Sequence, residues 1–557
     1  MAIARAETAG FEVRIKGIGS YNVPEGTSVA ELVKKLEKKL IYPVMAIIID
    51  NRLRDLNYRF TRSCAIELVD MNSEIGVRIY RRSMSFLLMK AARDLFPERV
   101  LTVKHSLSNG LLCEFLNEDS RTEEIEAIEK RMQEIVEDNL PIRRMRINKE
   151  KAQEIFREQG EEDKVKLLAY RDVDEVQVCE LDGFYENFYI FMLPETGMLK
   201  KFRLFEYPPG MILQTPELSA PNSLRPYVEQ KKLASIFQEA KNWAEMLGTP
   251  HVAALDDIIE HGDINDIIRV NEALHEKKIA FIADQICCDE DIRLVLISGP
   301  SSSGKTTFAQ RLLIQLRVNG KKPVVLSLDN YFVDRDLTPR DENNDYDFEA
   351  LEALKVDLFN EHLGRLIKGD EVEIPLYSFT RGSCEERGIS MKVPTGEPII
   401  IEGIHGLNER LTWSIPPEQK FKIYISALTQ LNIDYSNRIP TTDSRLVRRI
   451  VRDARTRGYN ALDTIKRWPS VRRGEERNIF SFQENADIMF NSSLVYELSV
   501  LKPYIEPLLR QIGPEHPEHV VARYLLQFAS YFKPIAPDAV PANSILREFI
   551  GGSCFKV

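Results

Sequence analysis

The sequence predicts a multidomain protein that combines α+β units in its N-terminal part with an α/β unit in its C-terminal part. Its 557 residues exceed what one hydrophobic core usually organises. Short alternating apolar runs and a capped helix open the chain, a pattern typical of small mixed sheets. Near residue 300 an apolar run, LVLIS, leads through a glycine-rich turn into a helical pattern. That succession is typical of a mostly parallel sheet flanked by helices.

Composition restricts the class of protein. Hydrophobic residues make up 43% and charged residues 29%, as in globular proteins, and no apolar run is long enough to cross a bilayer. The start, MAIARAETAGFEVRIK, has no continuous apolar signal core, so we expect a cytoplasmic location. A net charge of -10 disfavours indiscriminate binding to nucleic acid or membranes. Seven cysteines without a CxxC pair predict neither a disulfide framework nor a zinc ribbon.

The first unit is predicted over residues 1–76. Apolar residues alternate at Phe11, Val13 and Ile15, and Ser28 and Glu31 have capping-box spacing before an amphipathic helix. The runs VMAIIID and AIELVD supply further strands. From about residue 11 to 70, including YNVPEGTSVAELV, the sequence resembles a TGS domain, which implies a ubiquitin-like β-grasp fold.

The second unit is predicted over residues 77–220, between IYRRSMSFLLMKAARDLFP and LPETGMLKKFRLFEYPPG. It resembles the α+β editing domain that follows TGS in threonyl-tRNA synthetases, which implies a contact with tRNA or the ribosome. That family uses an HxxxH and a CxxxH pair, and the four matching positions here hold Arg82, Phe86, Phe188 and Met192. These side chains cannot supply the proton relay or the metal site, so we expect the fold without the hydrolytic activity.

Residues 221–290 repeat apolar side chains at helical spacing, so we expect a helical connector. His251, His261 and His275 lie in this segment, and we interpret them as surface or packed histidines instead of metal ligands. The last predicted unit covers residues 291–557 and ends in amphipathic helical patterns that pack on its sheet or form a contact within a homo-oligomer.

A phosphate-binding motif opens the last unit. Gly299, Gly304, Lys305 and Thr306 fit GxxxxGK[ST], with a strand before the turn and a helix after it. Backbone N–H groups of such a turn surround phosphates, the lysine neutralises the outer ones and the threonine hydroxyl coordinates Mg²⁺. The predicted nucleotide-binding residues are Gly299, Pro300, Ser301, Ser302, Ser303, Gly304, Lys305, Thr306 and Thr307.

Acidic residues follow or end the next two predicted strands. KPVVLSLDNYF carries Asp329, and EPIIIEG carries Glu402, at the sheet edge where ligands bind. Asp329 can take a proton from an attacking hydroxyl, and Glu402 can hold Mg²⁺ through water. Either acid alone could cap a helix or meet a surface cation. Together with the phosphate-binding turn they indicate phosphoryl transfer.

Seven motifs in this unit carry a family resemblance: GPSSSGKTT, SLDNYF, NDYDFEALEAL, IPLYSF, IIIEGIHGL, RLVRRIVRDARTRG and ENADIMFN. In this order they resemble uridine kinases, within the phosphoribulokinase and uridine kinase group, from about residue 292 to 494. The resemblance implies a kinase that transfers a phosphoryl group from ATP or GTP, with Mg²⁺, to the 5′-hydroxyl of a nucleoside, with uridine or cytidine as the leading candidates.

The resemblance also implies roles for the matching residues. Asp329 is the general base, Asp347 in YDF binds the sugar hydroxyls and Tyr377 in PLYSF lines the nucleoside pocket. Tyr331 in SLDNYF and Arg449 complete the expected substrate-binding set.

An arginine-rich stretch at residues 445–457 would, in isolation, most often be a solvated basic face. The kinase resemblance changes that interpretation, because Arg449, Arg452 and Arg457 match the family's lid arginines. Planar guanidinium donors can clamp the transferring phosphoryl oxygens. The predicted catalytic set is therefore Lys305, Asp329, Arg449, Arg452 and Arg457, with Thr306 and Glu402 as the metal set.

Two positions depart from the uridine kinase pattern. Gly382 stands where the family has a histidine, and Tyr459 stands where it has a final lid arginine. These departures leave the preferred base open. A translation-linked GTPase is a competing class, but the sequence has no N/T-K-x-D motif after the phosphate-binding turn. A regulatory tRNA-binding protein with an ATP-dependent switch, and a kinase of another small alcohol, stay open.

Overall fold

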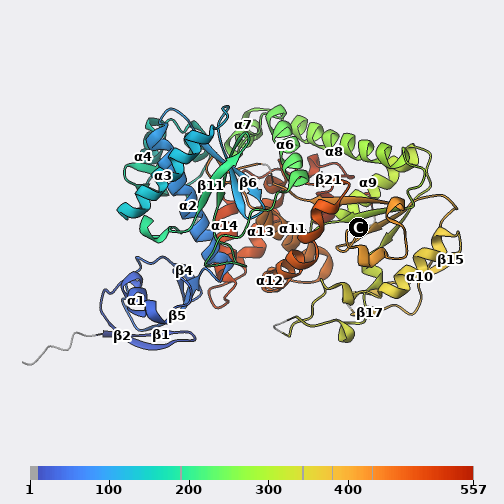
Figure 1. Ribbon diagram of the computed structural model, residues 1–557, viewed down its shortest axis with the longest axis horizontal. Helices are drawn as coiled ribbons and strands as arrows, with labels where there is room; N and C mark the ends of the chain where they lie inside the picture. Colours follow the sequence, from blue (N-terminus) through green and yellow to red (C-terminus); the bar gives the residue numbers. More distant parts are fainter. Residues whose placement is uncertain (1–9, 189–190, 342–343, 379–380, 430, 556–557) are drawn as a thin grey trace, which may run out of the picture.

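The computed structural model describes residues 10–188, 191–341, 344–378, 381–429 and 431–555. Most of the N-terminal stretch in which we expected no signal segment lies outside the described residues, as does Phe379 of the IPLYSF motif. Figure 1 shows the small N-terminal sheet beside a larger α+β unit, with the parallel sheet at the opposite end of the molecule. Within the described residues, the helices lack the combination of length and apolar character that crossing a bilayer requires.

The N-terminal sheet has the strand order β2-β1-β5-β3-β4, with β1 parallel to β5 and antiparallel to β2. Helix α1 begins with the predicted capping box: the Ser28 hydroxyl accepts from the Glu31 N–H at 3.2 Å, and the Glu31 carboxylate accepts from the Ser28 N–H at 3.0 Å. Its elements are β1 (Gly10–Ile15), β2 (Gly19–Pro24), α1 (Val29–Leu36), β3 (Val44–Ile49), β4 (Arg52–Arg54) and β5 (Cys64–Asp70).

The second unit contains two antiparallel sheets, β10-β9-β8 and β11-β12-β7-β6. Its first helix, α2, is capped by Ser73 and so begins at Glu74, two residues before the predicted boundary at 76. The elements are α2 (Glu74–Leu95), β6 (Leu101–Leu107), β7 (Gly110–Phe115), α3 (Thr122–Asp138), β8 (Ile142–Asn148), α4 (Lys149–Glu158), α5 (Glu162–Ala169), β9 (Glu175–Leu181), β10 (Phe184–Glu186), β11 (Arg203–Tyr207) and β12 (Gly210–Gln214).

Three of the four positions matched to the family's editing residues lie in this unit's interior, and the fourth, Arg82, is half-buried beside them. Phe86, Phe188 and Met192 are buried, and the two phenylalanine rings meet edge to face with centroids 5.4 Å apart. The Arg82 guanidinium covers the Phe188 ring. Apolar side chains therefore occupy three of the four positions at which the resemblance implies polar pairs.

Three helices follow and pack against the parallel sheet. They are α6 (Lys231–Met246), α7 (Val252–His261) and α8 (Ile264–Cys287). Buried side chains of α7 and α8, such as Leu255 and Ile279, belong to the same apolar cluster as Val295 and Ile423 of the sheet. Because this core is continuous across residue 290, the four-unit division stays a prediction.

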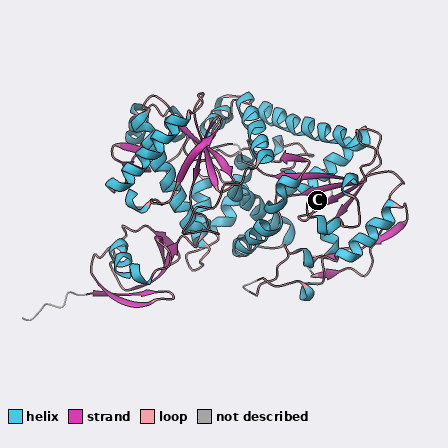
Figure 2. Ribbon diagram, in the orientation of Figure 1, coloured by secondary structure: helices cyan, strands magenta, loops and turns pink. Residues whose placement is uncertain are grey.

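The C-terminal part is built on the sheet β14-β19-β13-β20-β21, in which every neighbouring pair is parallel. This confirms the predicted fold class, and Figure 2 shows helices around these strands. The main elements are β13 (Leu294–Ser298), α9 (Lys305–Val318), β14 (Val324–Ser327), α10 (Val356–Ile367), β19 (Ile399–Glu402), β20 (Lys420–Ser426), α11 (Thr441–Arg452), α12 (Ala461–Asn478), β21 (Ile488–Asn491), α13 (Glu497–Arg510), α14 (His519–Ala529) and α15 (Arg547–Ile550). Two short hairpins, β15 (Glu371–Ile374) with β18 (Ile389–Lys392) and β16 (Tyr377–Ser378) with β17 (Ser383–Cys384), stand apart from the sheet.

A loop between β20 and α11 joins the C-terminal part to the second unit. We call residues 432–437 the docking loop. Asn437 donates to the Asn187 carbonyl at 2.9 Å and accepts from the Arg82 guanidinium at 3.1 Å. The Lys164 ammonium donates to the Ser436 hydroxyl at 3.1 Å, and the Tyr435 N–H donates to Asp163 at 2.8 Å. Polar contacts with α2, with α5 and with the residue that follows β10 thus hold the docking loop against the second unit.

His275 on α8 is fully buried beside Phe490 and Trp243, which supports its interpretation as a packed histidine. His251 instead caps α7, where its ring nitrogen accepts from the Ala254 N–H. Burial, with a smaller contribution from the Arg311 charge, lowers the His275 pKa to about 3. In the unfolded chain a histidine has a pKa of about 6.5.

We expect this histidine to make the protein less stable in mild acid. Below pH ~6.5 the histidine of the unfolded state binds a proton that buried His275 does not. The contribution of His275 to the free energy of unfolding is therefore present above that pH and is lost as pH falls. Between pH 7.5 and 5.5, His275→Phe should reduce the drop in unfolding free energy by about 1.4 kcal/mol. Urea unfolding at both pH values measures this drop. The exposed His261→Gln serves as control, and an unchanged drop in the His275 variant would contradict the prediction.

Candidate active site

A cavity of about 700 Å³ opens at the carboxyl edge of the parallel sheet. It brings together most of the residues that the sequence predicts for catalysis and metal binding, although they are spread along the chain from Ser301 to Arg457. The predicted residues that line it are Ser301, Ser302, Ser303, Gly304, Lys305, Thr306, Asp329, Tyr377, Glu402, Arg449, Arg452 and Arg457.

The phosphate-binding turn requires its two glycines for different reasons. At Gly299 a Cβ atom would lie 1.9 Å from the Ile425 carbonyl oxygen of β20, so no side chain fits. Gly304 has φ +85°, in the left-handed region, and a Cβ there would lie 2.4 Å from Ile545. Lys305 begins α9, and its ammonium donates to the carbonyls of Gly299 and Pro300 at 3.0 and 3.2 Å. The lysine charge is thereby held inside the turn.

The two predicted acids meet at the ends of neighbouring strands. Glu402 is the last residue of β19, and Asp329 lies in the short helical turn that follows β14. The Ser327 hydroxyl donates to the Glu402 carboxylate at 2.6 Å. Burial first, and the Asp329 charge second, raise the pKa of Glu402 to about 7, while Lys305 opposes that rise. Burial also lowers the Lys305 pKa, against the pull of both acids.

Asp453 holds the three predicted lid arginines. Its buried carboxylate lies 3.3 Å from Arg449, 3.0 Å from Arg452 and 3.8 Å from Arg457. Arg449 also donates to the Ser301 hydroxyl at 2.8 Å, which ties this group to the phosphate-binding turn. Asp453 begins a π-helical turn, Asp453–Arg457, a local structure that is frequent at functional sites. One carboxylate therefore orients three guanidinium groups towards the cavity.

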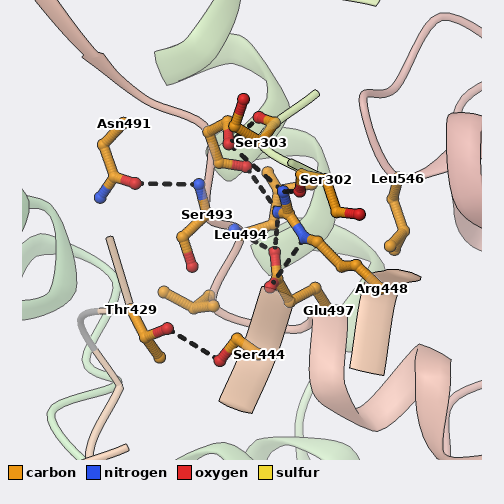
Figure 3. Close-up of polar contacts among 12 residues, drawn as sticks. Ser302, Ser303, Thr429, Ser444, Arg448, Asn491, Ser493, Leu494, Glu497 and Leu546 are labelled. Atoms are coloured by element: carbon orange, nitrogen blue, oxygen red, sulfur yellow. Dashed lines mark hydrogen bonds and ion pairs between the residues drawn. The ribbon is translucent and has the colours of Figure 1, made fainter. Parts of the chain in front are cut away.

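Two other arginines of α11 are buried, so the helix is not a solvated basic face. Arg448 is 0% exposed and pairs with Glu497, and its Nη2 donates to the Ser492 carbonyl at 2.9 Å. Its Nη1 donates to the Ser302 carbonyl at 3.3 Å. Figure 3 shows Arg448 between this serine and Glu497. The buried Arg448–Glu497 pair thus supports the phosphate-binding turn through the Ser302 carbonyl.

Arg445 on the same helix pairs with buried Glu475 of α12. The other carboxylate oxygen of Glu475 accepts from the Ser301 N–H at 2.9 Å. The turn is therefore fixed to α11 and α12 by two buried ion pairs.

Several predicted residues lie outside the cavity lining. Tyr331 is fully buried against Phe359, and its hydroxyl is 3.0 Å from His362, because the turn after β14 directs this ring into the core. Asp347 is 7% exposed and lies 3.5 Å from the Arg477 guanidinium. The structure therefore does not bring the Tyr331 side chain into the cavity, and Asp347 is turned towards α12.

Thr307 is buried as well and binds Glu548 of α15 instead of facing the open cavity. Gly299 and Pro300 contribute through their carbonyl groups, which accept from Lys305.

The two departures from the uridine kinase pattern change one wall of the site. A Cβ at Gly382 would lie 2.8 Å from the Arg335 guanidinium, so arginine occupies the space beside this glycine. Tyr459 lines the cavity, and the Arg467 guanidinium lies 4.1 Å from its ring centroid. This end of the cavity therefore carries arginines that the motif comparison did not predict.

Three acids in the site were missed by sequence reasoning. Asp453 follows Arg449 by four residues inside RRIVRDARTR, so helical spacing could have indicated the pair. Glu475 lies 174 residues from its partner Ser301 in the phosphate-binding turn, and Glu548 lies 241 residues from its partner Thr307 in α9. No local sequence pattern indicates such contacts.

Removing one member of the Arg448–Glu497 pair leaves a buried charge without its partner. We expect Arg448→Met to lower the free energy of unfolding by about 3–5 kcal/mol, measured by urea unfolding. The double variant Arg448→Met/Glu497→Gln should recover part of this loss, because it removes the unpaired charge. Arg510→Met, at an exposed position, should change stability by less than about 0.5 kcal/mol. A loss in the Arg448 variant no larger than that of the control would refute the supporting role.

Comparisons with known proteins divide the chain in two. The N-terminal region is similar to threonine–tRNA ligases: that of Symbiobacterium thermophilum is 33% identical over 183 residues, which cover 32% of this chain and 28% of the relative. The enzyme of Syntrophotalea carbinolica is 33% identical over 183 residues, 32% of this chain and 29% of the relative. The chain thus spans less than a third of the length of these curated relatives.

A solved structure described as a possible uridine kinase from Bacillus stearothermophilus is 19% identical, with a TM-score of 0.26, and covers 39% of this chain and 98% of its own. Residues 294–498 match the family model described as phosphoribulokinase / uridine kinase family. The chain therefore resembles threonine–tRNA ligases in its N-terminal region and the phosphoribulokinase and uridine kinase family at residues 294–498, which supports a P-loop kinase in the C-terminal part.

Proposed function

We propose that this protein is a nucleoside kinase that transfers the γ-phosphoryl group of ATP or GTP to the 5′-hydroxyl of a nucleoside. The observation that carries the proposal is that Lys305 and Asp329 line one cavity together with Arg449, Arg452 and Arg457. A cation for the phosphates, a base for the acceptor and a group of guanidinium donors are the parts that phosphoryl transfer requires.

Each residue has a proposed role in this reaction. Asp329 takes the proton from the acceptor hydroxyl as the hydroxyl oxygen forms a bond to the γ-phosphorus. At the same time the bond from that phosphorus to the bridging oxygen breaks, and ADP or GDP leaves. Lys305 and the arginines held by Asp453 neutralise the charge on the phosphoryl oxygens and the leaving group. The backbone N–H groups of the turn and of α9 orient the phosphates.

The oxygen donors near Lys305 fit Mg²⁺. The Thr306 hydroxyl and the Glu402 carboxylate line the same cavity, and Mg²⁺ prefers hard oxygen ligands shared with phosphates. When bound, the ion would add charge neutralisation at the phosphates. A divalent cation bound there would favour the ionised Glu402 carboxylate, against the effect of its burial.

Tyr377 is the proposed pocket residue for the nucleoside, and uridine or cytidine is the proposed acceptor. Asp345 and Tyr346 line the cavity where the motif comparison placed Asp347, so we include Asp345 as a candidate for the sugar hydroxyls. A screen of nucleosides with ATP or GTP, in which release of ADP or GDP is measured, tests the proposal. Release that no nucleoside stimulates would reject a nucleoside acceptor.

We expect Asp329→Asn to lower kcat by about 10²- to 10⁴-fold, the usual contribution of a general base, with ATP affinity within about threefold of wild type. The exposed Asp336→Asn, from the same segment, should keep wild-type turnover. Lys305→Ala should weaken both ATP binding and turnover. Wild-type turnover in the Asp329 variant would remove this residue as the base, and wild-type ATP affinity in the Lys305 variant would contradict the assignment of the turn.

The similarity to threonine–tRNA ligases favours a second candidate function, tRNA binding by the N-terminal units. In this proposal the C-terminal part acts as an ATP-dependent switch. Filter binding with tRNA at two salt concentrations distinguishes the two functions, because specific affinity without nucleoside-dependent turnover would favour the second. The same preparation should not hydrolyse a mischarged tRNA ester, since Phe86, Phe188 and Met192 replace the family's polar pairs.

A further inference from the structure

A carboxylate from the C-terminal segment binds the first turn of α9. The Thr307 N–H and hydroxyl both donate to the same oxygen of Glu548, at 3.3 and 3.0 Å. N–H groups in the first turn of a helix attract anions, and those after a phosphate-binding turn are the expected donors for nucleotide phosphates. Glu548 therefore makes the contacts that we expect a phosphate oxygen to make.

Glu548 also faces the rest of the site. It lines the same cavity as Lys305, Thr306 and Glu402, and it is close enough to Lys305 to favour the charged ammonium. A phosphate at this position would meet a second negative charge beside its own, and like charges in a largely buried site repel strongly. The carboxylate and a nucleotide thus compete for the same donors and the same cation.

The segment that carries Glu548 is packed in place. Ile545, Leu546 and Phe549 are each 0% exposed, and Ile545 lies directly against Gly304. The Arg448 guanidinium lies over the Phe549 ring, 5.0 Å from its centroid. The packing of these apolar side chains against the phosphate-binding turn therefore holds Glu548 beside Thr307.

The same segment is tied to the lid arginines. Arg455 donates to the carbonyls of Glu548 and Phe549 at 2.7 and 3.0 Å. Arg455 lies in the π-helical turn between Asp453 and Arg457, two residues whose side chains line the cavity. A movement that withdraws Glu548 therefore acts on the turn that orients the guanidinium groups.

We propose that residues 541–555 are a built-in competitor of the nucleotide: the Glu548 carboxylate occupies the phosphate donors of Thr307, and nucleotide binds after this carboxylate withdraws. The proposal rests on nucleotide binding at the turn, part of the proposed function, and does not depend on the acceptor. The apparent affinity for nucleotide is then reduced by the fraction of molecules in which Glu548 is withdrawn.

Isothermal titration of the full chain with Mg·ATP, without acceptor, tests the proposal. We expect Glu548→Gln to lower the Kd about tenfold, which corresponds to about 1.4 kcal/mol. Asp538→Asn removes the same charge from an exposed position in the neighbouring turn and should leave the Kd within twofold of wild type. A Glu548→Gln Kd equal to or higher than the wild-type value overturns the proposal.

Hydrogen exchange of the wild-type protein supplies a second test that needs no variant. Amides of residues 541–555 should exchange faster when Mg·ATP is added, and unchanged or slower exchange would mean that Glu548 is only a structural cap of α9. Lys305→Ala distinguishes the competitor role of Glu548 from nucleotide binding at the turn itself. ATP binding that needs Lys305 but ignores Glu548→Gln overturns the competitor alone, whereas absence of binding in every variant overturns the assignment of the turn as well.

Discussion

The parallel alignment of β13, β14 and β19 is the constraint on which the candidate site depends. Because the three strands run in one direction, their carboxyl ends meet at one edge, and the residues that follow them share one space. Lys305 follows the first strand, Asp329 the second, and Glu402 ends the third. The buried pairs of Arg445 and Arg448 then fix the helices that cover this edge against the phosphate-binding turn. The positions of these candidate site residues thus follow from strand direction, and two buried ion pairs support the turn that carries Lys305.

Sequence reasoning located the parts of this site that depend on local geometry. The phosphate-binding turn and the acid at the end of β19 are each specified by residues within a few positions of one another, as is the Ser28 capping box in the N-terminal unit, so the pattern identifies the structure. Arg449, Arg452 and Arg457 are predicted as lid arginines by resemblance, and the structure brings all three to the cavity. Their common partner, Asp453, was overlooked although it lies in the same run.

The remaining features depend on tertiary contacts that no local pattern encodes. Tyr331 stands two residues after Asp329, yet the backbone turn directs one side chain to the cavity and the other to the core. Glu548 reaches Thr307 from the far end of the chain, and the docking loop reaches Arg82 across more than 350 residues. The predicted connector is helical, but its helices share the core of the parallel sheet, because burying their apolar faces requires that sheet.

The docking loop ends just before α11, so contacts with the second unit fix the N-terminal end of the helix that carries Arg449 and Arg452. Arg78 of α2 also binds Asp443 in the first turn of α11, at 3.1 and 3.2 Å. Asp443 lies about two helical turns before Arg449 and Arg452, so this contact ties α2 to the same helix that carries both guanidinium groups. The second unit, whose core contains Phe86, Phe188 and Met192, thus fixes the start of the helix that carries Arg449 and Arg452.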